Sequence, residues 1–192
     1  KKRRLFLVGS DYVFPRAAHE IVRDHLKHRP DVEIVGEAFL PLGAEDVSAA
    51  VAKVRAADPD AILNTVNGTA NFRLFRALRA GWKSSAEVPV MSVSVPETDV
   101  AADPEAMAGD YLAGCTFESV GGPDGQALLA KVRQRFGKGR TLSDPMCAAY
   151  AGVHLWAKAV AEAKSLDAGK VAEAVGKVRV PSAFGELSVD PE

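Results

Sequence analysis

Cysteine is scarce in this sequence, which holds only Cys115 and Cys147 in 192 residues. Two cysteines do not make the disulfide framework on which small secreted domains depend. Cys115 lies in an apolar strand-like run and Cys147 in a helical one, so we expect two buried free thiols, with a disulfide between them left open. The four histidines lack the spacing to cysteine or acidic residues that metal ligands show, so no metal site is predicted.

An excess of charge of either sign is also missing. The sequence has 24 basic and 25 acidic residues and a formal net charge of −1. This balance predicts no nucleic-acid partner and no attraction to an anionic membrane. No apolar run approaches the ~18 residues that cross a bilayer. The opening KKRRLFLVGS has the basic flank of a signal peptide, but its apolar run is shorter than the ~7–15 residues of such a segment, so we expect a core strand there.

What the sequence does contain is a regular alternation of strand-like and helix-like segments. Alternation at this spacing predicts an α/β fold with a doubly wound, parallel, five-stranded sheet of flavodoxin-like order and helices on both faces. The expected strands are 3–9, 31–40, 58–66, 87–95 and 113–120, and the expected helices are 15–28, 45–57, 69–81 and 124–137.

Two of these helices carry a pattern that predicts which side faces the core. In the first helix, Ala18, Ile21, Val22 and Leu26 fall on one apolar face, which we expect to be buried. In the third helix, arginines at positions 73, 76 and 79 recur every three residues. We interpret that stripe as a solvated face and not as an anion site.

After residue 137 the alternation stops. A long helix begins at Ser143 or Asp144, and a second helix covers about 168–178 before a loop and a short strand. The long helix has an apolar face formed by Met146, Tyr150, Val153, Ala157 and Val160. This tail has no sheet of its own to cover. We therefore divide the chain into a ligand-binding lobe at 1–137 and a helical segment at 138–192 that packs on a second body.

Ligands of an open parallel sheet bind beyond the carboxyl ends of the strands. Four loops meet this description and are expected to share one rim. Their residues are Ser10, Asp11, Tyr12 and Phe14 after the first strand, Thr65, Val66, Asn67, Gly68 and Thr69 after the third, Ser94, Val95, Pro96 and Glu97 after the fourth, and Glu118, Ser119, Gly121 and Gly122 after the fifth.

Motifs of catalysis and of phosphate binding are missing from this rim. It has no G-x-G-x-x-G turn, no G-x-x-x-x-G-K-[ST] cradle and no G-x-S-x-G elbow. No aspartate ends the third strand, as a phospho-acceptor would require, and we expect no histidine on the rim. The sequence therefore predicts no cofactor and no enzymatic activity.

The remaining rim residues suit a small, neutral, polar solute. Tyr12 and Phe14 can form aromatic walls, and Asn67 offers both a donor and an acceptor. Thr69 and Ser94 add hydroxyl groups. Taken singly, Phe14 is equally explained as a contact with its own helix, and Asn67 as ordinary turn chemistry. Together on one rim they favour a binding site.

Several segments of the sequence resemble a known family. They are VGSDYVFPR at 8–16, FLPLGAEDVSAAVAKVRAADPDAILNTVNG at 39–68, VPVMSVSV at 88–95 and SDPMCAAYAGVHLWAKAV at 143–160. The sequence resembles the type I periplasmic binding proteins, in the branch that contains the urea-binding proteins of ABC transporters and the amide sensor of amidase operons. GSDYVFPR and NTVNG are the most specific of these pieces.

The resemblance implies a two-lobed protein that clamps its solute at a hinge, of which this chain is the carboxyl-terminal lobe. It implies a periplasmic substrate-binding protein whose partners are urea or a short-chain amide and an ABC permease. Tyr12 and Phe14 correspond to aromatics that line the amide pocket. The sensor has a second tyrosine in place of Phe14 and an apolar residue in place of Asn67, which favours the urea transporter.

Three alternatives stay open alongside this interpretation. One is a cytoplasmic amide sensor that regulates an amidase operon, and a second is a binding protein for branched-chain amino acids. The third, an enzyme of flavodoxin-like fold, is disfavoured because the rim has no catalytic constellation. If the second lobe is absent, self-association of the fragment through the uncovered helix is expected.

Overall fold

A computed structural model describes residues 3–190 of the chain. The chain forms two compact units, each described separately below. The first contains the residues up to Val95 together with Asp99–Ala113, and the second contains Pro96–Thr98 together with the residues from Gly114 onward.

The first unit is built on a five-stranded sheet with the order β2-β1-β3-β4-β5, in which every neighbouring pair is parallel. The predicted doubly wound α/β fold is confirmed. The strands are β1 (Arg4–Ser10), β2 (Glu33–Leu40), β3 (Ala61–Thr65), β4 (Val90–Ser92) and β5 (Tyr111–Leu112).

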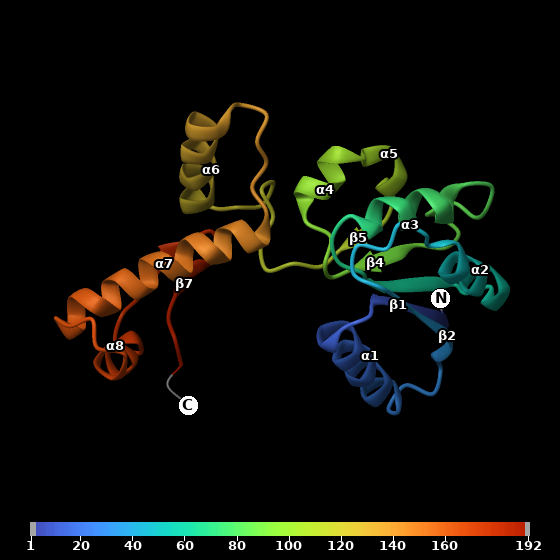
Figure 1. Ribbon diagram of the computed structural model, residues 1–192, viewed down its shortest axis with the longest axis horizontal. Coiled ribbons are helices and arrows are strands. Elements are labelled where there is room, and N and C mark those ends of the chain that lie inside the picture. Colours follow the sequence, from blue (N-terminus) through green and yellow to red (C-terminus); the bar gives the residue numbers. More distant parts are fainter. Residues whose placement is uncertain (1–2, 191–192) are drawn as a thin grey trace. The chain divides into compact units, whose positions relative to one another are not determined.

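Helices cover both faces of this sheet (Figure 1). Helix α1 (Val13–Leu26) lies on one face, and α2 (Ser48–Ala57) and α3 (Ala70–Arg79) lie on the other. The buried core is formed by apolar residues of the strands and of α2 and α3, such as Phe6, Val54, Ile62, Leu74 and Phe75. Two short helices before β5, α4 (Glu97–Ala102) and α5 (Pro104–Met107), were not predicted.

The fifth strand differs from its prediction. It ends at Leu112, and the segment 113–120 that was expected to be extended is irregular, with a turn at 118–120. The amide of Cys115 donates to Asp144 Oδ2 at 2.6 Å, and the amide of Glu118 donates to Glu97 Oε2 at 2.5 Å. Side-chain carboxylates have taken donors that a strand would use in its ladder. The expectation that Cys115 is buried was also wrong, because its side chain is exposed; Cys147 is buried, and both thiols are free.

Helix α1 is rotated relative to its predicted face. Pro15 and His19 are its buried residues, whereas Ile21, expected in the core, is 69% exposed. Gly9 of β1 explains this rotation. A Cβ on Gly9 would lie 2.8 Å from Pro15 Cβ and 3.2 Å from His19 Cε1, so the missing side chain lets the helix approach the strand along that line.

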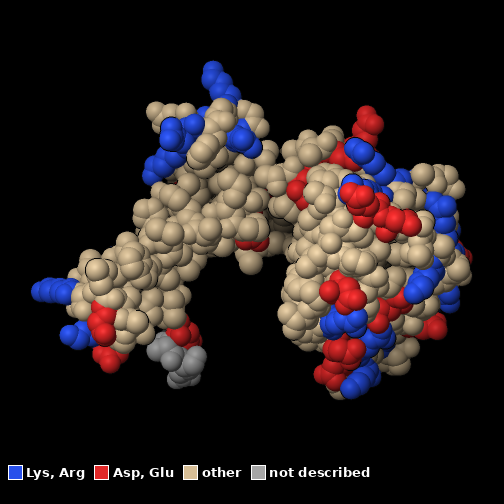
Figure 2. All heavy atoms as spheres, viewed as in Figure 1, with Lys and Arg blue, Asp and Glu red and all other residues tan. Residues whose placement is uncertain are grey.

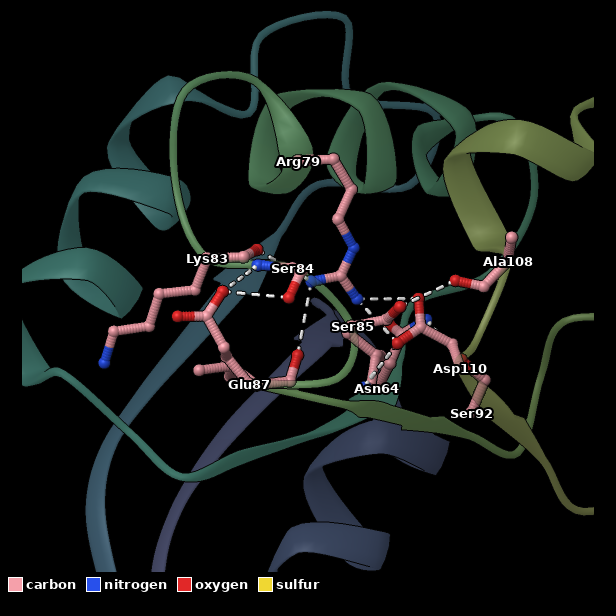
Figure 3. Close-up of polar contacts among 11 residues, drawn as sticks. Asn64, Arg79, Lys83, Ser84, Ser85, Glu87, Ser92, Ala108 and Asp110 are labelled. Carbon is pink, nitrogen blue, oxygen red and sulfur yellow. Dashed lines mark hydrogen bonds and ion pairs between the residues drawn. The ribbon is translucent and has the colours of Figure 1, made fainter.

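The arginine stripe of α3 is not uniformly solvated. Arg79 is only 17% exposed, and its Nη2 donates to both carboxylate oxygens of Asp110 at 2.6 and 2.7 Å (Figure 3). Its Nη1 donates to the carbonyl oxygens of Lys83 and Val88, and the amide of Val90 donates to Asp110. Burial raises the pKa of the Asp110 carboxyl, although the bonds from Arg79 and Val90 act in the opposite direction. The pair ties α3 to the start of β5.

The second unit contains three helices and a hairpin. These are α6 (Pro123–Phe136), α7 (Asp144–Ala163), α8 (Ala168–Val175) and the antiparallel strands β6 (Val180–Ser182) and β7 (Gly185–Leu187). The sequence assigned α6 to the sheet-containing lobe, but in the structure its Leu128 and Leu129 pack with Leu142 and Cys147 inside the second unit. The second compact unit thus includes the chain from Gly114 onward.

Helix α7 buries only a narrow stripe within its unit, formed by Cys147, Ala151, Leu155 and Ala159. Apolar residues outside this stripe are uncovered, with Val153 65% exposed and Trp156 55% exposed. Met146 and Tyr150 of the predicted apolar face are exposed as well, whereas Val160 is partly buried against the unit's own core. Figure 2 shows no charged side chain along the middle of this helix on the face in view.

No helix within residues 3–190 combines the length and the apolar character needed to span a membrane.

The ion pair between Arg79 and Asp110 predicts that replacing Arg79 lowers stability strongly. Replacing Arg73, which lies on the same helix, should have little effect on stability. Arg79→Ala leaves Asp110 buried without its guanidinium, so we expect the free energy of unfolding to fall by about 3 kcal/mol or more. Arg73→Ala, which removes an exposed arginine, should change it by less than about 0.5 kcal/mol. Guanidinium denaturation measures both, and equal losses for the two variants would contradict the role assigned to Arg79.

Candidate ligand-binding rim

Three strand ends meet at the carboxyl edge of the first unit and are tied together by Ser10. The Ser10 side chain is completely buried, and its Oγ accepts the backbone N–H of Asn67 at 2.9 Å. The amide of Asp11 donates to the carbonyl of Leu40 at 2.6 Å, and the amide of Tyr12 donates to that of Ser10. The turns after β1 and β3 are therefore held in a fixed relation to each other and to the end of β2.

Two aromatic side chains project from the turn after β1. Tyr12 is the extended N-cap residue of α1, and Phe14 lies in the first turn of that helix. Their ring centroids are 6.2 Å apart with the rings tilted by 42°. Phe14 remains 43% exposed, which is more than a ring buried against its own helix would show. The pair offers an uncovered apolar wall with one phenolic hydroxyl.

The charges on this turn neutralise each other. The Arg16 guanidinium lies 2.6 Å from Asp11 Oδ1 and 4.4 Å from the centre of the Phe39 ring. Asp11, predicted as a ligand-binding residue, is therefore engaged with Arg16. An open depression of about 410 Å³ lies beside this pair and is lined by α1 and by Glu37 and Phe39 of β2.

The turn after β3 presents the predicted residues Asn67, Gly68 and Thr69. Asn67 Nδ2 donates to the Thr65 carbonyl at 3.2 Å. Gly68 has a φ of 72°, a left-handed conformation that favours glycine, and its carbonyl accepts the amide of Asn71. Thr69 occupies the N-cap position of α3, and its hydroxyl makes no capping bond there.

The residues predicted after β4 are divided between the two units. Ser94 is partly buried and belongs to the first unit with the aromatic pair. Glu97 belongs to the second unit, where its carboxylate accepts the amide of Glu118. Glu118 in turn accepts bonds from Arg133 at 2.7 Å and from the amide of Leu142. The predicted single rim of four loops therefore reduces, within the first unit, to the loops after β1, β3 and β4.

Directly beneath the rim lies a buried polar network that the sequence did not reveal. Asn64 Nδ2 donates to Asn71 Oδ1 at 2.9 Å and to Ser92 Oγ at 3.0 Å, while Asn64 Oδ1 accepts the amide of Val66. Asn71 Nδ2 donates to the Val66 carbonyl at 2.7 Å. These bonds fix the chain on both sides of Val66. The only sequence signal was an asparagine inside the apolar run AILNT.

A buried histidine lies beneath the rim, although none is exposed on it. His19 is fully buried, its Nδ1 lies 2.7 Å from Glu37 Oε1, and its Nε2 lies 3.0 Å from Thr65 Oγ1 at the end of β3. Burial works against ionisation of Glu37, but hydrogen bonds and charges from His19 and Arg23 outweigh it and lower the pKa of the Glu37 carboxyl. Sequence spacing missed His19 because its strand partners are distant along the chain.

The rim presents aromatic, amide and hydroxyl groups, which are groups that contact small polar molecules in proteins. Within the part of the chain that the structure describes, no group of three or more His, Cys, Asp or Glu side chains is placed to hold a metal ion.

Comparisons with known proteins agree with this architecture. A family profile described as "Periplasmic binding protein domain" matches residues 1–192. An amino acid ABC transporter substrate-binding protein from Pseudomonas fluorescens superposes with a TM-score of 0.82 at 20% identity, over 100% of this chain and 51% of that one. A solute-binding protein from R. palustris in complex with 4-hydroxybenzoate superposes with a TM-score of 0.81 at 21% identity, over 99% of this chain and 52% of that one.

A third solved structure is the leucine-, isoleucine-, valine-, threonine- and alanine-binding protein from Brucella ovis in its closed conformation. It superposes with a TM-score of 0.79 at 16% identity, over 98% of this chain and 48% of that one. At these identities the likeness establishes the fold. The chain spans about half the length of the proteins it matches.

The lowered pKa of Glu37 predicts a pH dependence of stability. A carboxyl whose pKa is depressed by folding stabilises the native state above its ordinary value of 4.5, and this stabilisation is lost as the pH falls through the folded pKa. Glu37→Gln should therefore lower the free energy of unfolding at neutral pH by roughly 1.5–3 kcal/mol and should flatten its decline below about pH 5.

Glu20→Gln is the matched control, since Glu20 is exposed and lies 3.6 Å from the same Arg23. It should change stability by less than about 0.5 kcal/mol and leave the pH profile as in the unmodified protein. Denaturation curves over a series of pH values make the comparison. Identical profiles for the two variants would show that Glu37 does not form the bonds described.

Proposed function

This chain belongs to the periplasmic binding protein domain family, and we propose that its first unit forms one wall of the solute-binding cleft in the substrate-binding component of an ABC transporter. The observation that carries the proposal is the uncovered Tyr12–Phe14 pair beside the fixed Asn67 turn. Exposed aromatics on a rigid scaffold are typical of a recognition surface.

The solute that this wall suits is small, neutral and polar, such as urea or a short-chain amide. Arg16, which follows the aromatic pair on α1, is already matched by Asp11. Without an available cation a carboxylate gains little here, whereas an amide can stack on the rings and exchange hydrogen bonds with Asn67 and the Tyr12 hydroxyl. Binding and release, with no chemical step, is the activity that these groups support.

A second candidate is a carboxylate-bearing solute, either a branched-chain amino acid or an aromatic acid. Proteins of the same fold are described as binding such molecules. On this wall a carboxylate would have to draw Arg16 away from Asp11 or find its cation on another part of the protein. A panel of urea, acetamide, leucine and 4-hydroxybenzoate therefore separates the two candidates.

We further propose that the second unit packs on another lobe, as was expected for residues 138–192. The uncovered apolar surface of α7 and the half-length match to solved binding proteins support this arrangement. In that protein the solute lies between two lobes, an ABC permease receives it, and the location is the periplasm. A cytoplasmic sensor of the same build would bind the same solute and would lack the permease.

Affinity depends strongly on closure of such a cleft. Urea and acetamide have about four heavy atoms each, and a ceiling of about −1.5 kcal/mol per atom gives about −6 kcal/mol, on the order of tens of micromolar. Reaching this ceiling requires nearly every atom to be enclosed. The 192-residue chain presents one wall, so we expect it to bind in the millimolar range or not at all.

The proposed aromatic wall predicts that removing the Tyr12 ring weakens solute binding. In the full-length protein, Tyr12→Ala should weaken urea or acetamide binding at least tenfold, a loss of about 1.4 kcal/mol. Tyr12→Phe, which keeps the ring and removes the hydroxyl, should lose less binding affinity than Tyr12→Ala. Isothermal calorimetry with the four-solute panel measures both. Unchanged affinity of Tyr12→Ala would place the site elsewhere, and micromolar binding by the 192-residue chain would remove the need for a second wall.

The α7 surface predicts a stability effect that depends on the length of the chain. Trp156→Glu should cost the full-length protein roughly 2 kcal/mol or more, because the ring would be buried against the second lobe. In the 192-residue chain the same change should alter stability by less than about 0.5 kcal/mol, since Trp156 is 55% exposed there.

Thermal unfolding of both proteins, with light scattering of the shorter one, makes this measurement. Equal effects in the two proteins would contradict the packing on another lobe. A dimer of the 192-residue chain that Trp156→Glu dissociates would instead show that self-association covers this face.

A further inference from the structure

His19 joins three elements of the first unit beneath the rim. It lies on α1, its ring stacks on Phe39 of β2 with 5.0 Å between centroids, and both ring nitrogens have a partner. Nδ1 meets Glu37 of β2 and Nε2 meets Thr65 at the end of β3. Tyr12 lies two helical turns before His19, and Asn67 follows Thr65 by two residues. The bridge therefore connects the elements that carry the two parts of the proposed wall.

The space for this bridge exists only because residue 9 is glycine. A Cβ there would lie 2.5 Å from Thr65 Oγ1, in addition to its close approaches to α1. Neither Thr65 nor His19 has room to move aside, since both are buried in the first unit. The distance between α1 and the end of β3 is thus set by direct contact.

The hydrogen atoms of the bridge are coupled. A carboxylate only accepts, so Nδ1 donates to Glu37. Thr65 has a single hydroxyl hydrogen and two acceptors within reach, His19 Nε2 at 3.0 Å and the Val8 carbonyl at 3.2 Å. When Nε2 carries a proton, it donates to Thr65 and the hydroxyl turns to Val8. When Nε2 carries none, the hydroxyl turns to His19.

Other charges surround the bridge. Glu37 Oε1 lies 3.1 Å from Arg23 Nη2, and Arg23 also approaches Glu20 on α1. Arg16, paired with Asp11, covers the Phe39 ring on which His19 stacks. These four residues and Glu37 are the charged groups that face His19 from α1, β2 and the turn after β1.

We infer that the Glu37–His19–Thr65 bridge positions the Tyr12 and Asn67 parts of the wall relative to each other. None of the three side chains need touch the solute. The effect on affinity rests on the proposed solute-binding function, whereas the coupling between His19 and the two turns does not.

Thr65 offers a matched pair of variants for the test. Thr65→Val keeps the shape and removes the hydroxyl, and Thr65→Ser keeps the hydroxyl. In the full-length protein, calorimetry with urea and acetamide should show at least roughly tenfold weaker binding by Thr65→Val. Thr65→Ser should bind these solutes within about threefold of the unmodified protein. Equal behaviour of the two variants would overturn the inference.

NMR of the 192-residue chain without solute tests the bridge independently. The backbone amide shift of Tyr12, which lies on another element than Thr65, should change in Thr65→Val and should stay close to that of the unmodified chain in Thr65→Ser. An unchanged Tyr12 shift in Thr65→Val would overturn the positioning role whatever the solute is. A changed shift together with no binding by the full-length protein would refute the proposed function and leave the coupling intact.

Discussion

Every polar group buried beneath the carboxyl edge of the sheet must find a hydrogen-bond partner, because an unpaired one costs several kcal/mol. This constraint shapes the first unit. Six of the eight buried polar side chains of residues 3–190 lie here, namely Ser10, His19, Asn64, Thr65, Asn71 and Ser92. Each bonds to another strand end or to the backbone of an adjoining turn. The turns above them are consequently fixed by the same bonds that satisfy the interior.

In the proposed function, such a platform lets side chains at the rim recognise a small molecule with little loss of entropy. The rings of Tyr12 and Phe14 stand on a turn whose backbone is bound to β2, and Asn67 stands on a turn bound to β1 through Ser10. A solute of few atoms offers little binding energy, so a wall that is already ordered before binding retains more of it. The apolar core beneath, shared by the sheet and by α2 and α3, holds the platform in place.

The second unit follows a different rule, since its main helix has more apolar surface than its own unit covers. Cys147, Ala151, Leu155 and Ala159 fill the contact with neighbouring elements, while Trp156 and others remain uncovered. An apolar helix surface of this kind is typical of a packing interface. In the proposed function, the first unit supplies one wall of a cleft and the second supplies the surface that packs on another lobe.

The sequence by itself determined the parallel α/β sheet, its strand order and the presence of an aromatic turn at its carboxyl edge. These features follow from local alternation and from the rules of right-handed crossover, which need no knowledge of distant contacts. Only the tertiary structure decided that α1 turns His19 inward and Ile21 outward, that the Arg79 side chain is largely withdrawn from solvent, and that β5 stops at Leu112. Each of these depends on a partner remote along the chain, such as Thr65 for His19, Asp110 for Arg79 and Asp144 for Cys115. Helical periodicity identifies an apolar face, but the space above Gly9 and the position of a buried carboxylate select the residues that fill it, because close packing and paired charge are properties of the folded chain.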